Sequence, residues 1–226
     1  MEHTIVIACE MLEHEIRAAL KETALDCPVV WLERELHNRP DHLREVLQEE
    51  IDKAEPGTTV LLAFAQCGNA AVGLRSGDAK LVLPRFADCV HLFRSERVGD
   101  PGAVDNRTLY LSPGFLEERS GILKDYDRYC AKRGPEKARR ACRLMVKNYR
   151  AVSLMDTHAV GLDKYEPRCR DYADLLGLEM EYCEGSYRVL RKLFSGQWDE
   201  EFVIVPPGGC IDQEEFLGMP DAAGML

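Results

Sequence analysis

The chain has 226 residues, 46% hydrophobic and 30% charged, which is the composition of an ordinary globular protein with a sizeable core. Its 29 Lys and Arg against 39 Asp and Glu give a net charge of −10, which argues against nucleic acid or an anionic membrane as the main partner. No apolar stretch approaches the roughly 20 residues that span a bilayer, no basic segment precedes the first apolar run, and the nine cysteines lack the spacing of a disulfide scaffold. We therefore expect a cytoplasmic protein with reduced thiols.

The first half of the chain alternates short apolar runs with helical patterns. The apolar runs predict strands at residues 4–8, 28–32, 59–65, 80–83 and 108–111. Four-residue spacing of apolar side chains predicts a helix at about residues 10–23, and a second one from Pro40 to Ala54 with Asn38 as its cap. This β-α-β-α-β order is typical of a parallel sheet with right-handed crossovers.

The second half repeats these elements. It predicts helical segments at residues 125–149 (broken at Gly134-Pro135), 168–176 and 187–194, and strands at residues 151–155, 179–183 and 202–205. We therefore expect an α/β fold: a Rossmann-like parallel sheet with helices on both faces, in two α/β lobes with a cleft between them. The expected division is residues 1–115 for the first lobe, 116–217 for a smaller second lobe, and 218–226 for a mobile tail.

Three cysteines, Cys9, Cys67 and Cys89, each follow a predicted strand. Because the carboxyl ends of parallel strands meet at one edge of a sheet, residues far apart in sequence converge there. Thiolates select zinc or iron–sulfur clusters, and three rather than four would leave one metal position open to substrate. The alternative is three unrelated core thiols, since cysteine is often buried like a small hydrophobic residue.

Polar residues beside these thiols are candidates for substrate contacts. Gly68 and Asn69 could bind a polar ligand or form only a tight turn. Arg85 could hold a carboxylate or phosphate and Asp88 could carry a proton, unless the two form a surface ion pair. Glu10 is a second candidate for acid–base catalysis, although acidic residues are common in any first helical turn.

Short motifs spread over the whole chain carry a family resemblance. They are Ala8-Cys9-Glu10, His37-Asn38-Arg39-Pro40, Ala65-Gln66-Cys67-Gly68-Asn69, Pro84-Arg85-Phe86-Ala87-Asp88-Cys89, Leu111-Ser112-Pro113-Gly114-Phe115, Met155-Asp156-Thr157, Glu184-Gly185-Ser186 and Pro206-Pro207-Gly208. In this order they resemble the family called domain of unknown function 1638 (DUF1638). Ala65-Gln66 and Ala87 depart from that family's usual Tyr-Gly and His, which leaves the thiols intact but puts a shared substrate contact from either loop in doubt.

The resemblance implies a role near corrinoid-dependent methyl transfer in anaerobic one-carbon metabolism, with a corrinoid protein or methyltransferase as a partner. Together with the residues, it leads us to expect a 4Fe-4S cluster, or else zinc, on Cys9, Cys67 and Cys89. The cluster would act as a Lewis acid on a small polar substrate in lyase, dehydratase or desulfidase chemistry. The further residues expected to bind substrate from the second lobe are Asp156, Thr157, Gly185, Ser186 and Gly208. The alternative is a non-catalytic accessory protein that binds a metal, a corrinoid or a methyltransferase component. A homodimer is the default oligomer.

Overall fold

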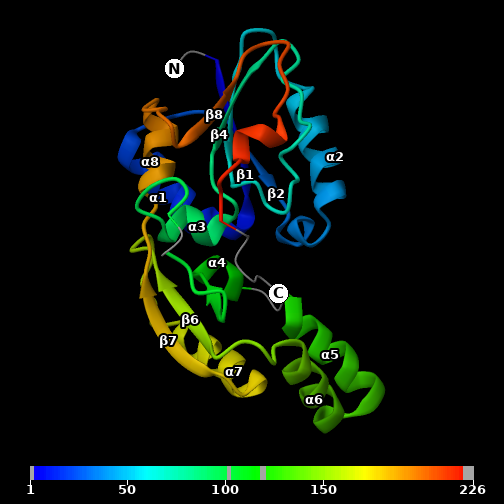
Figure 1. Cartoon of the computed structure of the whole chain (residues 1–226). Coiled ribbons are helices and arrows are strands. Elements are labelled where there is room, and N and C mark those ends of the chain that lie inside the picture. Colours follow the sequence, from blue (N-terminus) through cyan, green and yellow to red (C-terminus); the bar gives the residue numbers. More distant parts are fainter. Residues whose placement is uncertain (1–2, 101–102, 118–120, 221–226) are drawn as a thin grey trace. The chain divides into compact units, whose positions relative to one another are not determined.

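The computed structural model describes residues 3–100, 103–117 and 121–220. The chain forms two compact units (Figure 1). The first unit comprises residues 1–103 and 186–222, and the second comprises residues 104–185 and 223–226. This division differs from the expected boundaries because residues 186–222 return to the first unit instead of completing the second. The tail expected at 218–226 lies outside the described residues from position 221 onward.

The first unit contains a five-stranded sheet in the order β2-β1-β3-β4-β8. Its strands are β1 (Thr4–Cys9), β2 (Val29–Leu32), β3 (Thr59–Ala63), β4 (Lys80–Pro84) and β8 (Phe202–Val205). The first four are parallel, and in their register Ala8 faces both Trp31 and Ala63. The expected α/β class and parallel sheet are therefore confirmed.

The edge strand β8 runs antiparallel to β4, with Leu81 opposite Val205 and Pro84 opposite Phe202. The sequence predicts this strand but not its place, because we expected it in the second lobe. Its direction has a geometric consequence: residues that follow β8 start from the amino end of β4, at the edge of the sheet opposite to the carboxyl ends of the parallel strands.

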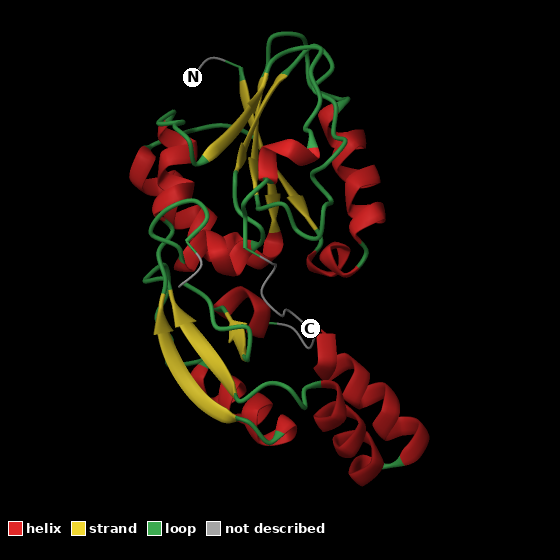
Figure 2. Ribbon diagram, viewed as in Figure 1, coloured by secondary structure: helices red, strands yellow, loops and turns green. Residues whose placement is uncertain are grey.

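Helices cover both faces of this sheet (Figure 2). The helices α1 (Glu13–Thr23) and α8 (Arg188–Ser195) pack against each other on one face, and α2 (Pro40–Ile51) lies on the other (Figure 1). The expected first helix is split, because a 3-10 turn, η1 (Glu10–Leu12), precedes α1. Likewise Arg39, not Asn38, precedes α2, since Asn38 ends the 3-10 helix η2 (Arg34–Asn38).

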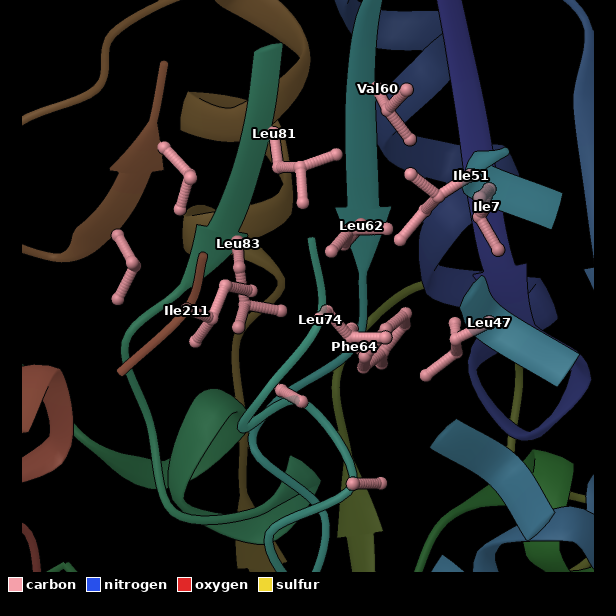
Figure 3. Packing of buried hydrophobic residues seen from close by; sticks show 14 of the residues in the cluster. Ile7, Leu47, Ile51, Val60, Leu62, Phe64, Leu74, Leu81, Leu83 and Ile211 are labelled. Atoms are coloured by element: carbon pink, nitrogen blue, oxygen red, sulfur yellow. The ribbon is translucent and has the colours of Figure 1, made fainter. Parts of the chain in front are cut away.

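The core between α2 and the sheet is built from alternate strand residues (Figure 3). Val60, Leu62, Leu81 and Leu83 point from β3 and β4 to this face, as the two-residue period of a strand requires. The buried side chains that complete the cluster include Leu47 and Ile51 of α2 and Phe64, Leu74 and Ile211 of the loops. The core therefore fixes both α2 and the long loop that follows β3.

Polar contacts from α2 also hold this loop. The Arg44 guanidinium donates through Nη2 to the carbonyl of Asn69 at 2.9 Å. The amide of Gln48 donates to the Arg75 carbonyl at 3.0 Å and accepts the Arg75 N–H at 2.8 Å. The loop that contains Cys67 is thus tied to a helix at two points.

A partly buried ion pair connects α8 to the segment before β8. Arg188 contacts both carboxylate oxygens of Glu201, at 2.6 and 2.7 Å, and Lys192 donates to Glu201 at 2.6 Å. Burial by itself raises the pKa of Glu201, but the hydrogen bonds from Arg188 and Lys192 outweigh it, so this pKa lies below its usual range. The paired carboxylate stabilises the return of the chain to the first unit.

The second unit has a three-stranded parallel sheet in the order β5-β6-β7. Its elements are β5 (Thr108–Leu111), α4 (Pro113–Leu116), α5 (Gly121–Arg133), α6 (Pro135–Met145), β6 (Ala151–Asp156), α7 (Glu166–Leu176) and β7 (Glu179–Glu184). The helix α7 packs on β6 and β7, and α5 and α6 form an antiparallel pair (Figure 2). Arg143 of α6 donates to the carbonyls of Asp174 and Leu175, which stabilises the end of α7.

In the part of the chain that the structure describes, no helix combines the length and the apolar character of a membrane-spanning segment.

Candidate functional site

The three predicted thiols follow three adjacent strands of the first unit. Cys9 is the last residue of β1, Cys67 lies four residues after β3, and Cys89 begins the short helix α3 (Cys89–Arg94) after β4. Because β1, β3 and β4 are neighbours and parallel, their carboxyl ends lie along the same edge of the sheet. The topology therefore carries the three cysteines toward one place.

Cys67 and Cys89 are in direct contact, with their Sγ atoms 3.8 Å apart. Two backbone hydrogen bonds beyond the ends of β3 and β4 produce this approach: Gln66 N–H to the Phe86 carbonyl at 2.9 Å, and Cys67 N–H to the Ala87 carbonyl at 3.2 Å. The contact with Cys67, followed by burial, raises the pKa of Cys89 well above its usual value.

Cys9 belongs to the same cluster of thiols. Burial, and next the negative charge that Cys89 carries when ionised, raise the pKa of Cys9 to about 12, whereas the positive charge of Arg34 acts in the opposite direction. Cys9 therefore lies within electrostatic reach of Cys89. We call Cys9, Cys67 and Cys89 the thiol cluster. At neutral pH the raised pKa values keep Cys9 and Cys89 protonated unless a cation replaces the protons.

The three thiols are suitable ligands for a thiophilic metal, but their side chains would have to move to bind one ion together. Among the residues that the structure describes, no three His, Cys, Asp or Glu side chains are already arranged to hold one metal ion. Two sulfurs on one tetrahedral zinc ion stand about 3.8 Å apart, given Zn–S bonds of about 2.3 Å. The Cys67–Cys89 distance matches this spacing, so these two sulfurs already stand as far apart as two ligands of one zinc ion. On a 4Fe-4S cluster each cysteine binds a different iron, so the sulfurs of Cys67 and Cys89 would have to separate.

The loop that carries Cys67 has an unusual backbone. Cys67, Gly68 and Asn69 have φ values of 48°, 65° and 69°, which place three successive residues in the left-handed region. A Cβ on Gly68 would lie 3.1 Å from Pro40 Cγ, so glycine serves both the conformation and the close approach. The nearly buried Gln66 amide donates to Asn69 Oδ1 at 2.7 Å, which closes the turn. The structure thus holds Gly68 and Asn69 beside the thiol of Cys67.

Asp88, one of the two carboxylates expected to carry a proton, has a structural task. Its Oδ1 caps α3 by accepting the His91 N–H at 2.8 Å, and the same oxygen lies 2.9 Å from His91 Nδ1. Both side chains are buried, with 2% and 3% exposure. An Asp followed three residues later by a hydrogen-bonding side chain is a helix-start signal that reveals this pair in the sequence.

Glu10, the other expected acid–base group, lies beside Cys9 with 38% of its side chain exposed. Its Oε2 is 3.9 Å from Nε of Arg34, and Nη2 of Arg34 is 3.6 Å from Oε2 of Glu13. Arg34 is itself 9% exposed and was not among the expected site residues. Glu10 is therefore accessible to solvent and lies near the buried guanidinium of Arg34.

Arg85, the residue expected to hold a carboxylate or phosphate, is bound by a backbone carbonyl. Its Nε donates to the carbonyl of Glu215 at 2.6 Å, in the 3-10 helix η3 (Gln213–Phe216). The side chain remains partly exposed. Arg85 thus attaches the C-terminal segment to the end of β4.

Three of the expected substrate residues gather within the second unit. Asp156 ends β6, Thr157 is buried behind it, and the Gly185 N–H donates to the Asp156 carbonyl at 2.8 Å. A Cβ on Gly185 would lie 2.9 Å from Met155, so no larger residue fits there without a shift. This group forms a compact turn at the carboxyl ends of β6 and β7.

Ser186 and Gly208 lie in the first unit. The Ser186 N–H donates to the Phe93 carbonyl of α3 at 2.8 Å, and its Oγ accepts the Arg188 N–H at 3.2 Å at the start of α8. Gly208 follows the antiparallel strand β8, and its N–H donates to the Gly77 carbonyl at 2.7 Å, before β4 begins. The structure therefore places Gly208 at the edge of the sheet opposite to the thiol cluster and does not bring it to that site.

A family model described as protein of unknown function (DUF1638) matches residues 31–194. The chain belongs to this family. The DUF1638 match runs from β2 to α8, so it includes Cys67, Cys89 and the second unit but starts after Cys9. No match is found among curated proteins or among solved structures.

Proposed function

We propose that this DUF1638 protein binds a metal centre through Cys9, Cys67 and Cys89 and uses it on a small polar substrate. The observation that supports the proposal is the convergence of thiols from three adjacent parallel strands, with Cys67 and Cys89 in contact. Metal binding requires cysteine ligands in the thiolate form, so a metal that binds here replaces the thiol protons and gains the energy of three sulfur ligands. The carboxyl ends of parallel strands are where open α/β sheets bind ligands, and thiolates are ligands that select zinc or iron–sulfur clusters.

Three protein ligands leave one position for substrate. A 4Fe-4S cluster bound in this way supplies a Lewis acid that polarises an oxygen or sulfur atom of the substrate, as lyases, dehydratases and desulfidases require. Glu10 is the residue that carries a proton, because it is beside Cys9 and reaches solvent. Asn69 and the backbone around Gly68 orient the substrate from the Cys67 loop.

Zinc is the second candidate occupant. The 3.8 Å between Cys67 and Cys89 matches the sulfur spacing on a single tetrahedral ion. A zinc ion with three thiolates and an open position supports the same Lewis-acid role without a redox step.

An accessory role is the second candidate function. Two side chains that were expected to act on substrate are already bound within the protein, and this favours an accessory role. Asp88 contacts His91, and Arg85 donates to the Glu215 carbonyl. In this role the thiol cluster would bind a metal or a corrinoid without turnover. The family resemblance supplies the corrinoid protein or methyltransferase as the partner to test.

Metal analysis of the anaerobically purified protein tests the proposal. Iron, acid-labile sulfide and zinc are measured in the wild type and in Cys9→Ser, Cys67→Ser and Cys89→Ser. We expect each of these variants to lose most of the bound metal. The matched control is Cys210→Ser, because Cys210 is an exposed thiol of the same unit and bonds only to the neighbouring Ile211 carbonyl among the contacts described.

The outcomes are distinct. Iron with an equal amount of sulfide identifies a cluster, and zinc without sulfide identifies a single-ion site. Equal metal content in the wild type and in all three cysteine variants would overturn the site. A stable complex with a corrinoid protein, and an absorption spectrum that small polar substrates leave unchanged, would favour the accessory role.

A further inference from the structure

The second unit contains a cavity with a volume of about 570 Å³. This volume lies within the roughly 300–1,000 Å³ that is typical of small-molecule sites. The walls come from the end of α4 and from α5, α6 and α7, which are labelled in Figure 1. The lining residues run from Leu116 to Leu175, so the second unit forms this cavity by itself.

One wall of the cavity is a stripe of α7. Arg168, Asp171, Tyr172 and Leu175 recur at spacings of three and four residues, so they share one face of this helix. Arg168 is already bound within the protein, because its Nη1 donates to the carbonyl of Leu116 at 2.8 Å. Asp171 is exposed, and its carboxylate takes part in none of the hydrogen bonds and ion pairs of the described residues.

The wall from α6 carries a cation, Arg139. Arg143, one turn later on the same face of α6, donates to the carbonyls of Asp174 and Leu175 and holds α6 against the end of α7. Arg139 therefore lies on the side of α6 that faces α7, and it lines the cavity. Its guanidinium is exposed and, in the part of the chain that the structure describes, has no hydrogen bond or ion pair.

Arg139 and Asp171 thus bring opposite charges to one cavity without pairing with each other. A ligand that is only an anion is attracted by Arg139 but repelled by Asp171 and by Asp174, a second carboxylate of the same wall. A ligand that is only a cation meets the reverse. A molecule that carries a carboxylate and an ammonium group a short distance apart complements both walls.

The remaining wall is apolar and aromatic. Leu123 and Tyr126 lie three residues apart on α5 and line the cavity together with Leu116 and the buried Tyr172. Ligand sites typically combine such a surface with a few polar groups that fix the orientation of the ligand. An apolar side chain on a zwitterionic ligand gains binding energy by leaving water for this wall.

We propose that this cavity binds a free α-amino acid with an apolar or aromatic side chain. The guanidinium of Arg139 binds the carboxylate of the amino acid, in the two-pronged geometry that arginine offers, and the carboxylate of Asp171 binds its ammonium group. The site goes beyond the proposed function, because it shares no residue with the thiol cluster and requires no metal.

Isothermal titration calorimetry of the full-length protein with three related probes tests this proposal. L-Phenylalanine carries both charges, 3-phenylpropanoate lacks the ammonium group, and 2-phenylethylamine lacks the carboxylate. We expect L-phenylalanine to bind about 10-fold more tightly than either of the other probes, because each missing charge removes a charge-assisted hydrogen bond.

Two variants assign the charges to their residues. Arg139→Gln should weaken the binding of L-phenylalanine about 10-fold without weakening that of 2-phenylethylamine. Asp171→Asn should weaken L-phenylalanine to a similar extent without weakening 3-phenylpropanoate. The matched control is Arg140→Gln, because Arg140 is the next residue of α6 and is also exposed, but it is not among the residues that line the cavity.

The results that would overturn the proposal are specific. No binding of L-phenylalanine up to about 10 mM would mean that the cavity holds only solvent. Equal affinities for the three probes, or an Arg140→Gln variant as weak as Arg139→Gln, would also overturn the assignment. Cys67→Ser should bind L-phenylalanine as the wild type does, so failure of this site and failure of the metal site are separate results.

Discussion

Replacing Asp88 with alanine should destabilise the first unit by removing two contacts at once. The carboxylate accepts the His91 N–H at 2.8 Å and lies 2.9 Å from His91 Nδ1, and both residues are at most 3% exposed. Loss of a helix N-cap costs about 1 kcal/mol, and a buried donor left without a partner costs about 1–3 kcal/mol. The free energy of unfolding should therefore fall by about 2–4 kcal/mol.

Urea unfolding followed by tryptophan fluorescence measures this change. The two tryptophans, Trp31 and Trp198, both lie in the first unit, so their emission reports the unit that contains Asp88. Asp88→Asn is the control, because its amide oxygen still accepts the His91 N–H and should preserve more than half of the lost stability. An alanine variant within about 0.5 kcal/mol of the wild type, or an asparagine variant as unstable as alanine, would refute the capping role.

Three further predictions concern the same unit. Oxidation with diamide should link Cys67 to Cys89, since their sulfurs are 3.8 Å apart and need to close to about 2.05 Å; peptide mapping by mass spectrometry that finds a different main pair would contradict this. Gly68→Ala should weaken metal binding, because the added Cβ meets Pro40 and the φ of Gly68 is +65°. The control Gly208→Ala, with φ +80° and open space around its Cβ, should change only stability. Equal metal affinities in the two variants would argue against metal binding by the loop that carries Cys67. Glu201→Gln should be less stable than the wild type at pH 7. The difference in stability should shrink as the pH falls below about 4.5, because the stabilisation from a carboxylate of lowered pKa is lost when that carboxylate is protonated in the folded protein. Thermal unfolding measures this difference, and a difference that grows in acid would contradict the lowered pKa of Glu201.

The strands were predictable because each is a short apolar run between turn residues. Residues 80–83 and 108–111, for example, are found almost unchanged as β4 and β5. The placement of the three cysteines after parallel strands also follows from the sequence, since connection rules determine which strand ends share an edge. Cys67 and Cys89 are in contact because they follow adjacent parallel strands, β3 and β4.

Other features depend on distant parts of the chain and left little local signal. The direction of β8 is determined by its pairing with β4, about 120 residues earlier, so the role of Gly208 could not be judged from its turn motif. The six-residue helix α3 is too short for a periodic pattern, although Asp88 marks its start. Arg34, two residues after β2, is only 9% exposed, and a single arginine in the sequence carries no signal of such burial.

The interruption of the first unit by the second has a consequence for how the protein is made and dissected. The first segment ends at Ala103, whose carbonyl accepts from Arg94 at 3.1 Å, and the second segment begins at Ser186, which donates to Phe93 at 2.8 Å. The chain thus leaves and returns to the first unit at points bound to consecutive residues of α3. This is the arrangement of a domain with a second domain inserted into it. During synthesis β8 can pair with β4 only after residues 104–185 have been made, so the sheet of the first unit is completed late.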